Sequence, residues 1–137
     1  IKIALDSGAG DHVAGPDQVG SGRIRQSSGS RRGQHFIDAS GNRIENQGES
    51  ELHMLEPGGK RIKSVFQVAD VHKALLSITR IADAGYECLL GARGGRLLDV
   101  HTGETIPIAR KGNLYVMKAW VKNDSESATT MGFARQG

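Results

Sequence analysis

The residues best suited to chemistry stand at positions 6 to 8, where a carboxylate, a hydroxyl and a glycine follow one another. Asp6 comes after an apolar run at residues 3–5, and this order predicts a buried strand that delivers one acid into a tight turn. The hydroxyl of Ser7 is placed to orient the acid by a hydrogen bond, and Gly8 lets a backbone or a ligand approach closely. The stretch is therefore a candidate for acid–base chemistry. Ordinary turn formation is the alternative interpretation, because Asp, Ser and Gly are common turn residues.

The composition indicates one domain with a modest core and many turns. A chain of 137 residues has the length of a single domain and can bury a core without disulfides. Hydrophobic residues make up only 37% of the chain, whereas glycine accounts for 19 residues, about twice its usual share. We therefore expect short elements joined by glycine-containing turns.

Cysteine content and hydropathy indicate the redox compartment of the protein and whether the sequence predicts a membrane segment. Cys88 is the one cysteine, so a disulfide within the chain is excluded; we expect it to be buried in a strand of a protein from an intracellular, reducing compartment. No stretch approaches the roughly 18 apolar residues of a membrane helix, no signal peptide is visible, and we expect no membrane partner. Because the chain begins in a strand without an initiator methionine, we expect it to be a segment of a longer polypeptide.

Apolar runs separated by glycine-containing turns predict a mainly β barrel or sandwich. Ser77 is a candidate N-cap for the one helix that we expect, over residues 78–84. Pro107 predicts an edge strand, because proline has no N–H to donate. Residues 15–35 are predicted to be a flexible loop rich in Gly, Ser and Arg, and residues 122–137 a disordered polar tail. The other expected elements are a strand at 1–5, a hairpin with its tip at 38–42, a hairpin over 51–69 with its turn at 56–59, and strands at 86–90, 96–100, 105–109 and 114–121.

Several short motifs follow one another in a fixed order along residues 1–121. They are Leu5-Asp6-Ser7-Gly8-Ala9, then Asp38-Ala39-Ser40-Gly41-Asn42 with Ile44 and Gly48, then Phe66-Gln67-Val68-Ala69-Asp70-Val71, then Leu75-Leu76-Ser77, and finally Leu114-Tyr115-Val116 with Trp120-Val121. In this order the motifs resemble the retropepsin-like aspartic proteases, and the protease segments of copia-like retrotransposon polyproteins in particular. The resemblance implies a closed β-barrel with one short helix near the C-terminal half.

The resemblance also implies a role for each motif. Asp6 would be the catalytic acid, Ser7 would support it through its hydroxyl, and Gly8 would lie against the substrate or against the acid of a partner. The residues implied to contact substrate are Ala9 and the hairpin tip Asp38, Ala39, Ser40, Gly41 and Asn42. Residues 38–46 would form a flap that closes over the substrate and excludes water. Leu75, Leu76 and Ser77 would support the loop that carries the acid, with Ser77 in the place where retroviral enzymes have glycine.

The implied activity is hydrolysis of peptide bonds by a water held between two carboxylates that share one proton. Only one Asp-Ser-Gly tripeptide is present, so the second acid would come from a second copy of the chain. The implied partners are therefore a second copy of the chain and a peptide or polyprotein substrate. We expect the chain to process its own polyprotein. No cofactor is implied.

Two other functions compete with this interpretation. The short stretch before Asp6, Ser77 in place of glycine and the polar tail favour a protease-like module that binds or dimerises without cleaving. Residues 23–33 contain four arginines and no acid, which is compatible with a basic nucleic-acid-binding β-domain. The run lacks aromatic residues for stacking, so a solvated loop is the favoured interpretation and nucleic acid an unlikely partner.

The histidines do not have the spacing of a metal site. His12, His35, His53, His72 and His101 are scattered along the chain, and no pattern of Cys and His indicates a metal ligand set. We therefore expect no metal. His12 lies six residues beyond Asp6 and is a candidate for tuning that acid, although an exposed surface position is the favoured expectation.

Overall fold

β-Strands make up most of the regular structure, as the sequence predicts. The computed structural model describes residues 1–20, 23–38 and 40–121. The strands are β1 (Lys2–Asp6), β2 (Val13–Ala14), β3 (His35–Ile37), β4 (Arg43–Glu45), β5 (Gly48–Leu55), β6 (Arg61–Val68), β7 (Ala74–Ser77), β8 (Tyr86–Gly91), β9 (Gly94–Asp99), β10 (Thr105–Lys111), β11 (Leu114–Lys118) and β12 (Trp120–Val121). The helices within the described residues are α1 (Pro16–Val19), α2 (Ser28–Arg31) and α3 (Ile78–Asp83).

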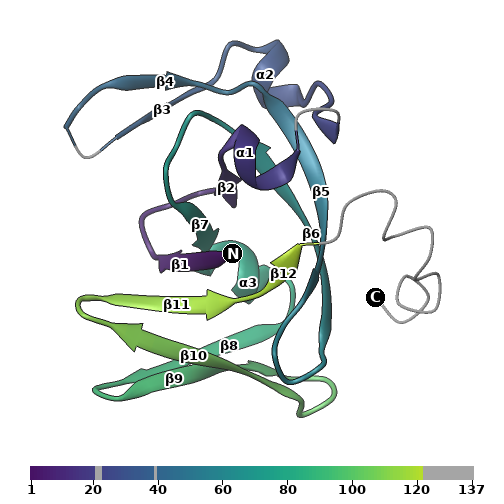
Figure 1. Cartoon of the computed structure of the whole chain (residues 1–137), viewed down its shortest axis with the longest axis vertical. Helices are drawn as coiled ribbons and strands as arrows, with labels where there is room; N and C mark the ends of the chain where they lie inside the picture. Colours follow the sequence, from purple (N-terminus) through teal and green to yellow (C-terminus); the bar gives the residue numbers. More distant parts are fainter. Residues whose placement is uncertain (21–22, 39, 122–137) are drawn as a thin grey trace.

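The strands form one large open sheet and one separate hairpin (Figure 1). The large sheet has ten strands in the order β12-β5-β6-β2-β7-β1-β11-β10-β9-β8, and β3 pairs only with β4. The sheet has two free ends, β12 and β8, so the expectation of a closed barrel is wrong. The chain itself joins distant parts of the sheet, because only Ala119 separates β11, next to β1, from β12, which pairs with β5.

Strand β1 lies between two strands that come much later in the chain. It pairs in parallel with β7 and antiparallel with β11. Ile3 is fully buried, and Ala4 is almost so, which explains why this apolar run forms an interior strand. The strand therefore holds its last residue, Asp6, by pairing on both sides of the residues that precede it.

The hairpin of β5 and β6 supplies much of the core. Alternate residues of β5 are buried, as expected for a strand with one face on the core. Leu52, Phe66 and Val68 are fully buried, and the turn lies at residues 56–59, so the predicted second hairpin is confirmed. Gly48 begins β5 at φ +134°, where a Cβ would lie 2.3 Å from the carbonyl oxygen of Arg25.

The helices confirm one expectation and correct another. Helix α3 begins after Ser77, whose hydroxyl accepts a hydrogen bond from the N–H of Arg80, as predicted. Residues 15–35, expected to be a loop, contain α1 and α2, so the expectation of a single helix is wrong. Each of these helices is one turn long and depends on local signals, Pro16 at the start of α1 and a reciprocal Ser27–Ser30 pair at the start of α2. Apolar periodicity does not detect so short a helix.

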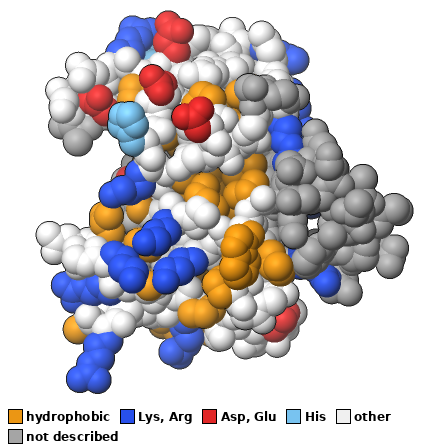
Figure 2. Space-filling model, viewed as in Figure 1, with side chains coloured by type: hydrophobic (Ala, Val, Ile, Leu, Met, Phe, Trp, Pro, Cys, Tyr) orange, Lys and Arg blue, Asp and Glu red, His pale blue; other side chains and the backbone are white. Residues whose placement is uncertain are grey.

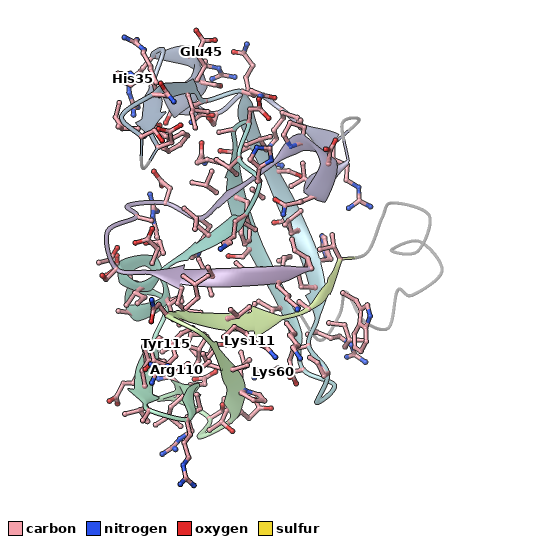
Figure 3. The ribbon with its side chains drawn as sticks, turned by 60° about the vertical axis from the view of Figure 1, so that its left-hand side comes forward. His35, Glu45, Lys60, Arg110, Lys111 and Tyr115 are labelled. Atoms are coloured by element: carbon pink, nitrogen blue, oxygen red, sulfur yellow. The ribbon has the colours of Figure 1, made fainter. Side chains whose placement is uncertain are left out.

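Two expectations about the last strands need correction. Strand β10 lies between β9 and β11 and is not an edge strand, but residues 105–108, which include Pro107, pair only with β9. The single strand expected at residues 114–121 is divided at Ala119, whose N–H donates to the carbonyl oxygen of Ile1 over 3.0 Å. Arg110 and Tyr115 of β10 and β11, in the lower part of Figure 3, donate to the carbonyl oxygens of Ala92 and Gly91 and so fasten the two last hairpins together.

Some expectations fall on residues without a structural description. The predicted polar tail at 122–137 and Ala39 of the hairpin tip lie outside the described residues. Cys88 lies in β8 and is half-buried, and burial raises the pKa of its thiol. Among the described residues, no helix is long and apolar enough to cross a membrane.

The two faces of β6 predict opposite costs for neighbouring substitutions. Phe66 is fully buried and Val65 is 38% exposed. Phe66→Ala should lower the free energy of unfolding by about 3–5 kcal/mol, because it removes buried apolar surface and leaves a cavity. Val65→Ala should lower it by less than about 1 kcal/mol. Urea unfolding of both variants measures the difference, and equal losses would contradict the assigned orientation of the strand.

Candidate active site

Asp6 stands at the end of β1, where the chain turns away from the sheet. It lies in register with Ser77 on the parallel strand β7. One carboxylate oxygen, Oδ1, accepts a hydrogen bond from the N–H of Gly8 over 2.8 Å. A Cβ at Gly8 would lie only 3.3 Å from the same oxygen, so glycine allows this close approach. The half-buried carboxylate has no ion-pair partner within the described residues and is available to a ligand on its other oxygen.

Ser7 does not orient the acid in this structure. Its side chain is exposed and makes no hydrogen bond within the described part of the chain. The backbone N–H of Gly8 performs the orientation that the sequence assigned to the Ser7 hydroxyl. The hydroxyl is thus free for contact with another molecule.

Ser77 fastens the loop that follows Asp6. The residue is fully buried, and its hydroxyl donates to the carbonyl oxygen of Ala9 over 2.7 Å. Its backbone N–H donates to Nδ1 of His12 over 2.9 Å. Glycine at this position would keep the backbone hydrogen bond to His12 but lose the hydroxyl hydrogen bond to Ala9. The serine therefore adds a hydroxyl anchor where the resemblance implies only close packing.

His12 is buried, and the expectation of a surface histidine is wrong. Only 9% of its surface is exposed, and its ring packs on Phe66 with a centroid distance of 5.2 Å. The ring accepts the Ser77 N–H at Nδ1, so its own proton resides on Nε2 while it is neutral. Burial first, and then the nearby charge of Arg80, lower the pKa of His12 to about 4, although Asp11 opposes the shift.

Arg80 of α3 supplies the remaining anchors of the loop. Its Nε donates to the carbonyl oxygen of Gly10 over 3.0 Å, and its Nη2 pairs with the carboxylate of Asp11. The sequence interpretation missed both Arg80 and Asp11. The sequence does show an arginine in the first turn of the capped helix, three residues after Ser77. It does not show that this arginine reaches the loop after Asp6, because that depends on the pairing of β1 with β7.

The hairpin of β3 and β4 extends to the side of the molecule where β1 ends, on the left of Figure 1. His35 and Glu45 pair at its base, at the top of Figure 3. The tip is held by Asp38, whose Oδ1 accepts the N–H groups of Ser40 and Asn42 over 2.9 and 2.8 Å. These bonds, first that of Asn42, lower the pKa of Asp38. Gly41 adopts φ +84° in this turn.

The two leucines before Ser77 face opposite sides of β7. Leu76 is buried in the core, while Leu75 is half-buried and lies in register with Ala4 and Val13. Leu75 and Leu76 thus lie beside Ala4 and Leu5 of β1, the two residues before the acid, and their role as support for the loop stays a prediction. Among the described residues, no group of three His, Cys, Asp or Glu side chains is placed to hold a metal ion.

Comparison of the chain with known protein-family models, with curated proteins and with solved structures found no match. The geometry of the site therefore carries the functional argument. It consists of one acid at a strand end, a loop anchored at four points, and a hairpin on the same side of the molecule.

The buried His12 predicts that acid destabilises the fold. Protonation would place a charge beside Arg80 and remove the acceptor of the Ser77 N–H. Because the pKa of His12 is lower in the folded chain, about 4, than its ordinary 6.5, the unfolded chain binds the proton first. The His12 contribution should be complete above pH 6.5 and decline as the pH falls to 4, by about 3 kcal/mol in all.

The measurement is urea unfolding between pH 4 and 7 of the wild type and of His12→Asn. Asparagine offers an acceptor oxygen near the position of Nδ1 but does not titrate. The wild type should lose about 3 kcal/mol relative to the variant over this range. Parallel pH profiles of the two proteins would show that His12 is not the group responsible.

Proposed function

We propose that the chain is an aspartic endopeptidase that works as a homodimer and belongs to the retropepsin-like proteases. The observation that carries the proposal is the placement of Asp6, a carboxylate at the end of an interior strand, oriented by the N–H of Gly8 and lacking an ion-pair partner within the described residues. The anchored loop and the hairpin on the same side add support. Processing of its own polyprotein is the activity that this class of protease implies.

The proposed reaction needs two Asp6 carboxylates, one from each copy, that share a proton. The charged carboxylate accepts a proton from water while the water oxygen attacks the carbonyl carbon of the peptide. The protonated carboxyl gives its proton to the carbonyl oxygen, and a tetrahedral diol results. Breakage of the C–N bond then restores the carbonyl, and the leaving nitrogen receives a proton from the dyad.

The loop anchors suit this chemistry because two carboxylates must meet within hydrogen-bond distance. A loop that moved freely would weaken the sharing of the proton and the activation of water. In the proposed dimer the exposed Ser7 and Gly8 of each copy face the partner or the substrate. The β3–β4 hairpin closes over the peptide and excludes water.

Asp6→Asn is the direct test of the proposed function. The variant keeps an oxygen for the Gly8 N–H but cannot act as a base, so cleavage of peptides at mildly acid pH should fall by at least about 10²–10⁴-fold. Asp17→Asn, an exposed aspartate on α1, is the matched control and should retain activity. Mass spectrometry of a peptide library measures cleavage, and circular dichroism checks the fold.

Undiminished cleavage by the folded Asp6→Asn variant would exclude the assignment. A wild-type chain that cleaves nothing and sediments as a monomer at high concentration would favour the inactive binding module instead. A dimer without pepstatin-sensitive activity would favour the same module in its dimerising form.

A second candidate function, binding of a nucleic-acid backbone, is favoured by a surface other than residues 23–33. In that arginine-rich run, Arg25 pairs with Glu49 over 2.9 Å. A more basic surface is the outer sheet face, defined here as the exposed face of β1, β11, β10 and β9 that carries Lys2, Lys118, Lys111 and Arg96. Figure 2 shows Lys and Arg gathered over β8–β11, while acidic side chains gather at the opposite end around α2 and β3–β4.

Lys2 and Lys118 stand directly opposite each other on neighbouring antiparallel strands. Like charges in this position repel and destabilise a sheet, and no carboxylate pairs with either lysine within the described residues. The acids on or beside this face are Asp6 at the end of β1 and Glu87 on the adjoining strand β8. An anionic partner would relieve the repulsion.

Nucleic-acid binding by this face predicts a change in salt dependence. The logarithm of the association constant for single-stranded RNA falls linearly with the logarithm of the salt concentration. Replacing Lys2 and Lys118 by Gln should make this slope shallower by about 1.4, because two phosphate contacts are lost. Lys73→Gln, an exposed lysine outside the face, is the control and should leave the slope unchanged. Fluorescence anisotropy with a labelled oligonucleotide measures both, and an unchanged slope in the double variant would exclude this function.

A further inference from the structure

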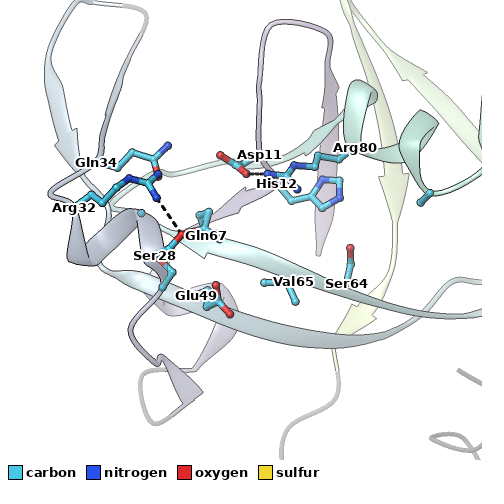
Figure 4. A pocket seen from close by; sticks show the side chains of 13 residues that line it. Asp11, His12, Ser28, Arg32, Gln34, Glu49, Ser64, Val65, Gln67 and Arg80 are labelled. Carbon is cyan, nitrogen blue, oxygen red and sulfur yellow. Dashed lines mark hydrogen bonds and ion pairs between the residues drawn. The ribbon is translucent and has the colours of Figure 1, made fainter.

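A polar cavity lies between the loop that follows Asp6 and the base of the β3–β4 hairpin (Figure 4). Its volume is about 570 Å³. One side is formed by His12, Asp11 and Arg80, and another by Arg32 and Gln34 at the end of α2 and the start of the hairpin. Figure 4 shows Arg32 and His12 on opposite sides of this space. Asp11 and His12 follow the exposed Ser7 and Gly8 in the chain, and Gln34 comes directly before β3, so the cavity lies between residues that flank both segments of the proposed peptide contact.

The charges around the cavity leave one positive group unbalanced. Asp11 is paired with Arg80, and Glu49 is paired with Arg25 through Nε and Nη2 over 3.0 and 2.9 Å. Arg32 has a different partner, the neutral hydroxyl of Ser28, to which its Nη1 donates over 3.2 Å. No carboxylate within the described residues lies at ion-pair distance from Arg32. The four charged residues that line the cavity balance in number, two acids and two arginines, but Arg32 is the one among them that has no ion-pair partner within the described residues.

Hydrogen-bond donors face the same space. His12 is nine-tenths buried, and its Nδ1 is occupied by the Ser77 N–H, so the neutral ring keeps a donor at Nε2. This Nε2–H has no partner within the described residues, and His12 lines the cavity. Ser64 adds a hydroxyl from β6. The guanidinium of Arg32, the imidazole N–H of His12 and the hydroxyl of Ser64 together form a donor set for an anion.

We propose that this cavity binds a carboxylate side chain, Asp or Glu, of the peptide that the chain cleaves, with Arg32 as the charged contact and the Nε2–H of His12 as the second donor. The inference rests on the proposed peptidase function. A carboxylate suits the site because Arg32 can donate two parallel N–H groups to its two oxygens. Arg32 is exposed at the rim of the cavity, and a neutral side chain would gain no ion pair with it. The site therefore selects acidic over neutral residues at one position of the substrate.

The test separates binding from cleavage. The whole chain with Asp6→Asn, which cannot turn over substrate in the proposed mechanism, is titrated with a scanning set of extended peptides that carry Glu or Gln at one position at a time. Calorimetry should find one position at which Glu binds at least tenfold tighter than Gln. Arg32→Gln should abolish this preference, and the control Arg31→Gln should keep it, because Arg31 does not line the cavity and its Nε donates to Gln26.

A second readout follows the histidine directly. Binding of the Glu peptide should shift the NMR signal of the His12 Nε2–H and raise the pKa of that ring, whereas the Gln peptide should leave both unchanged. These shifts distinguish a contact with His12 from a general loss of affinity in the Arg32 variant.

Each other outcome overturns one statement. Equal affinity for Glu and Gln at every position, or a preference that survives Arg32→Gln, overturns the cavity proposal whatever the wild type cleaves. Binding of a phosphoserine peptide more than tenfold tighter than of its Glu counterpart overturns the choice of a carboxylate in favour of a phosphate. Failure of the wild type to cleave any peptide of the set, the Glu peptides included, contradicts the peptidase function, and leaves a Glu preference in the Asp6→Asn chain as evidence for the binding module.

Discussion

The geometry of the site depends on one buried serine. Ser77 ends β7, begins α3 and anchors the loop after Asp6, because its hydroxyl reaches Ala9 and its N–H reaches His12. A residue with three structural duties couples the parts that it joins. The position of the acid cannot change without disturbing a strand end, a helix start and a buried hydrogen bond. This coupling holds a loop rich in small residues, which on its own would sample many conformations.

In the proposed homodimer, the same coupling would bring two different pH requirements into one small region. Two carboxylates that share a proton work best in mild acid, where one of them stays protonated. The anchor at His12 works only while the imidazole is neutral, and its lowered pKa keeps it neutral well into that range. A surface histidine with an ordinary pKa would be protonated at the mildly acid pH at which an aspartic dyad acts. Its Nδ1 could then no longer accept the Ser77 N–H. Burial of the ring against Phe66 thus extends the working range of the loop toward acid.

Sequence reasoning succeeded where the signal is local and failed where it depends on tertiary contacts. The strand before Asp6, the hairpin at residues 51–69 and the cap at Ser77 follow from alternation, turn residues and capping chemistry. The burial of His12 does not follow from such local signals, because it depends on Phe66 of β6 and Arg80 of α3, which are distant in the sequence. The open sheet was missed for the same reason, since the order of strands depends on pairing. The one-turn helices in residues 15–35 depend on side-chain caps too brief for a periodic pattern.

The pairing of β1 also affects the order in which the chain folds. Its neighbours, β7 and β11, come about seventy and more than one hundred residues later, so both pairings close very long loops. During synthesis the strand that carries the acid has no neighbour until residues 74–77 emerge and lacks its second until residues 114–118 emerge. The hairpins between them depend on nearby residues and can form earlier. The candidate site is consequently among the last parts of the fold to be completed, which delays its exposure in ordered form on a growing polypeptide.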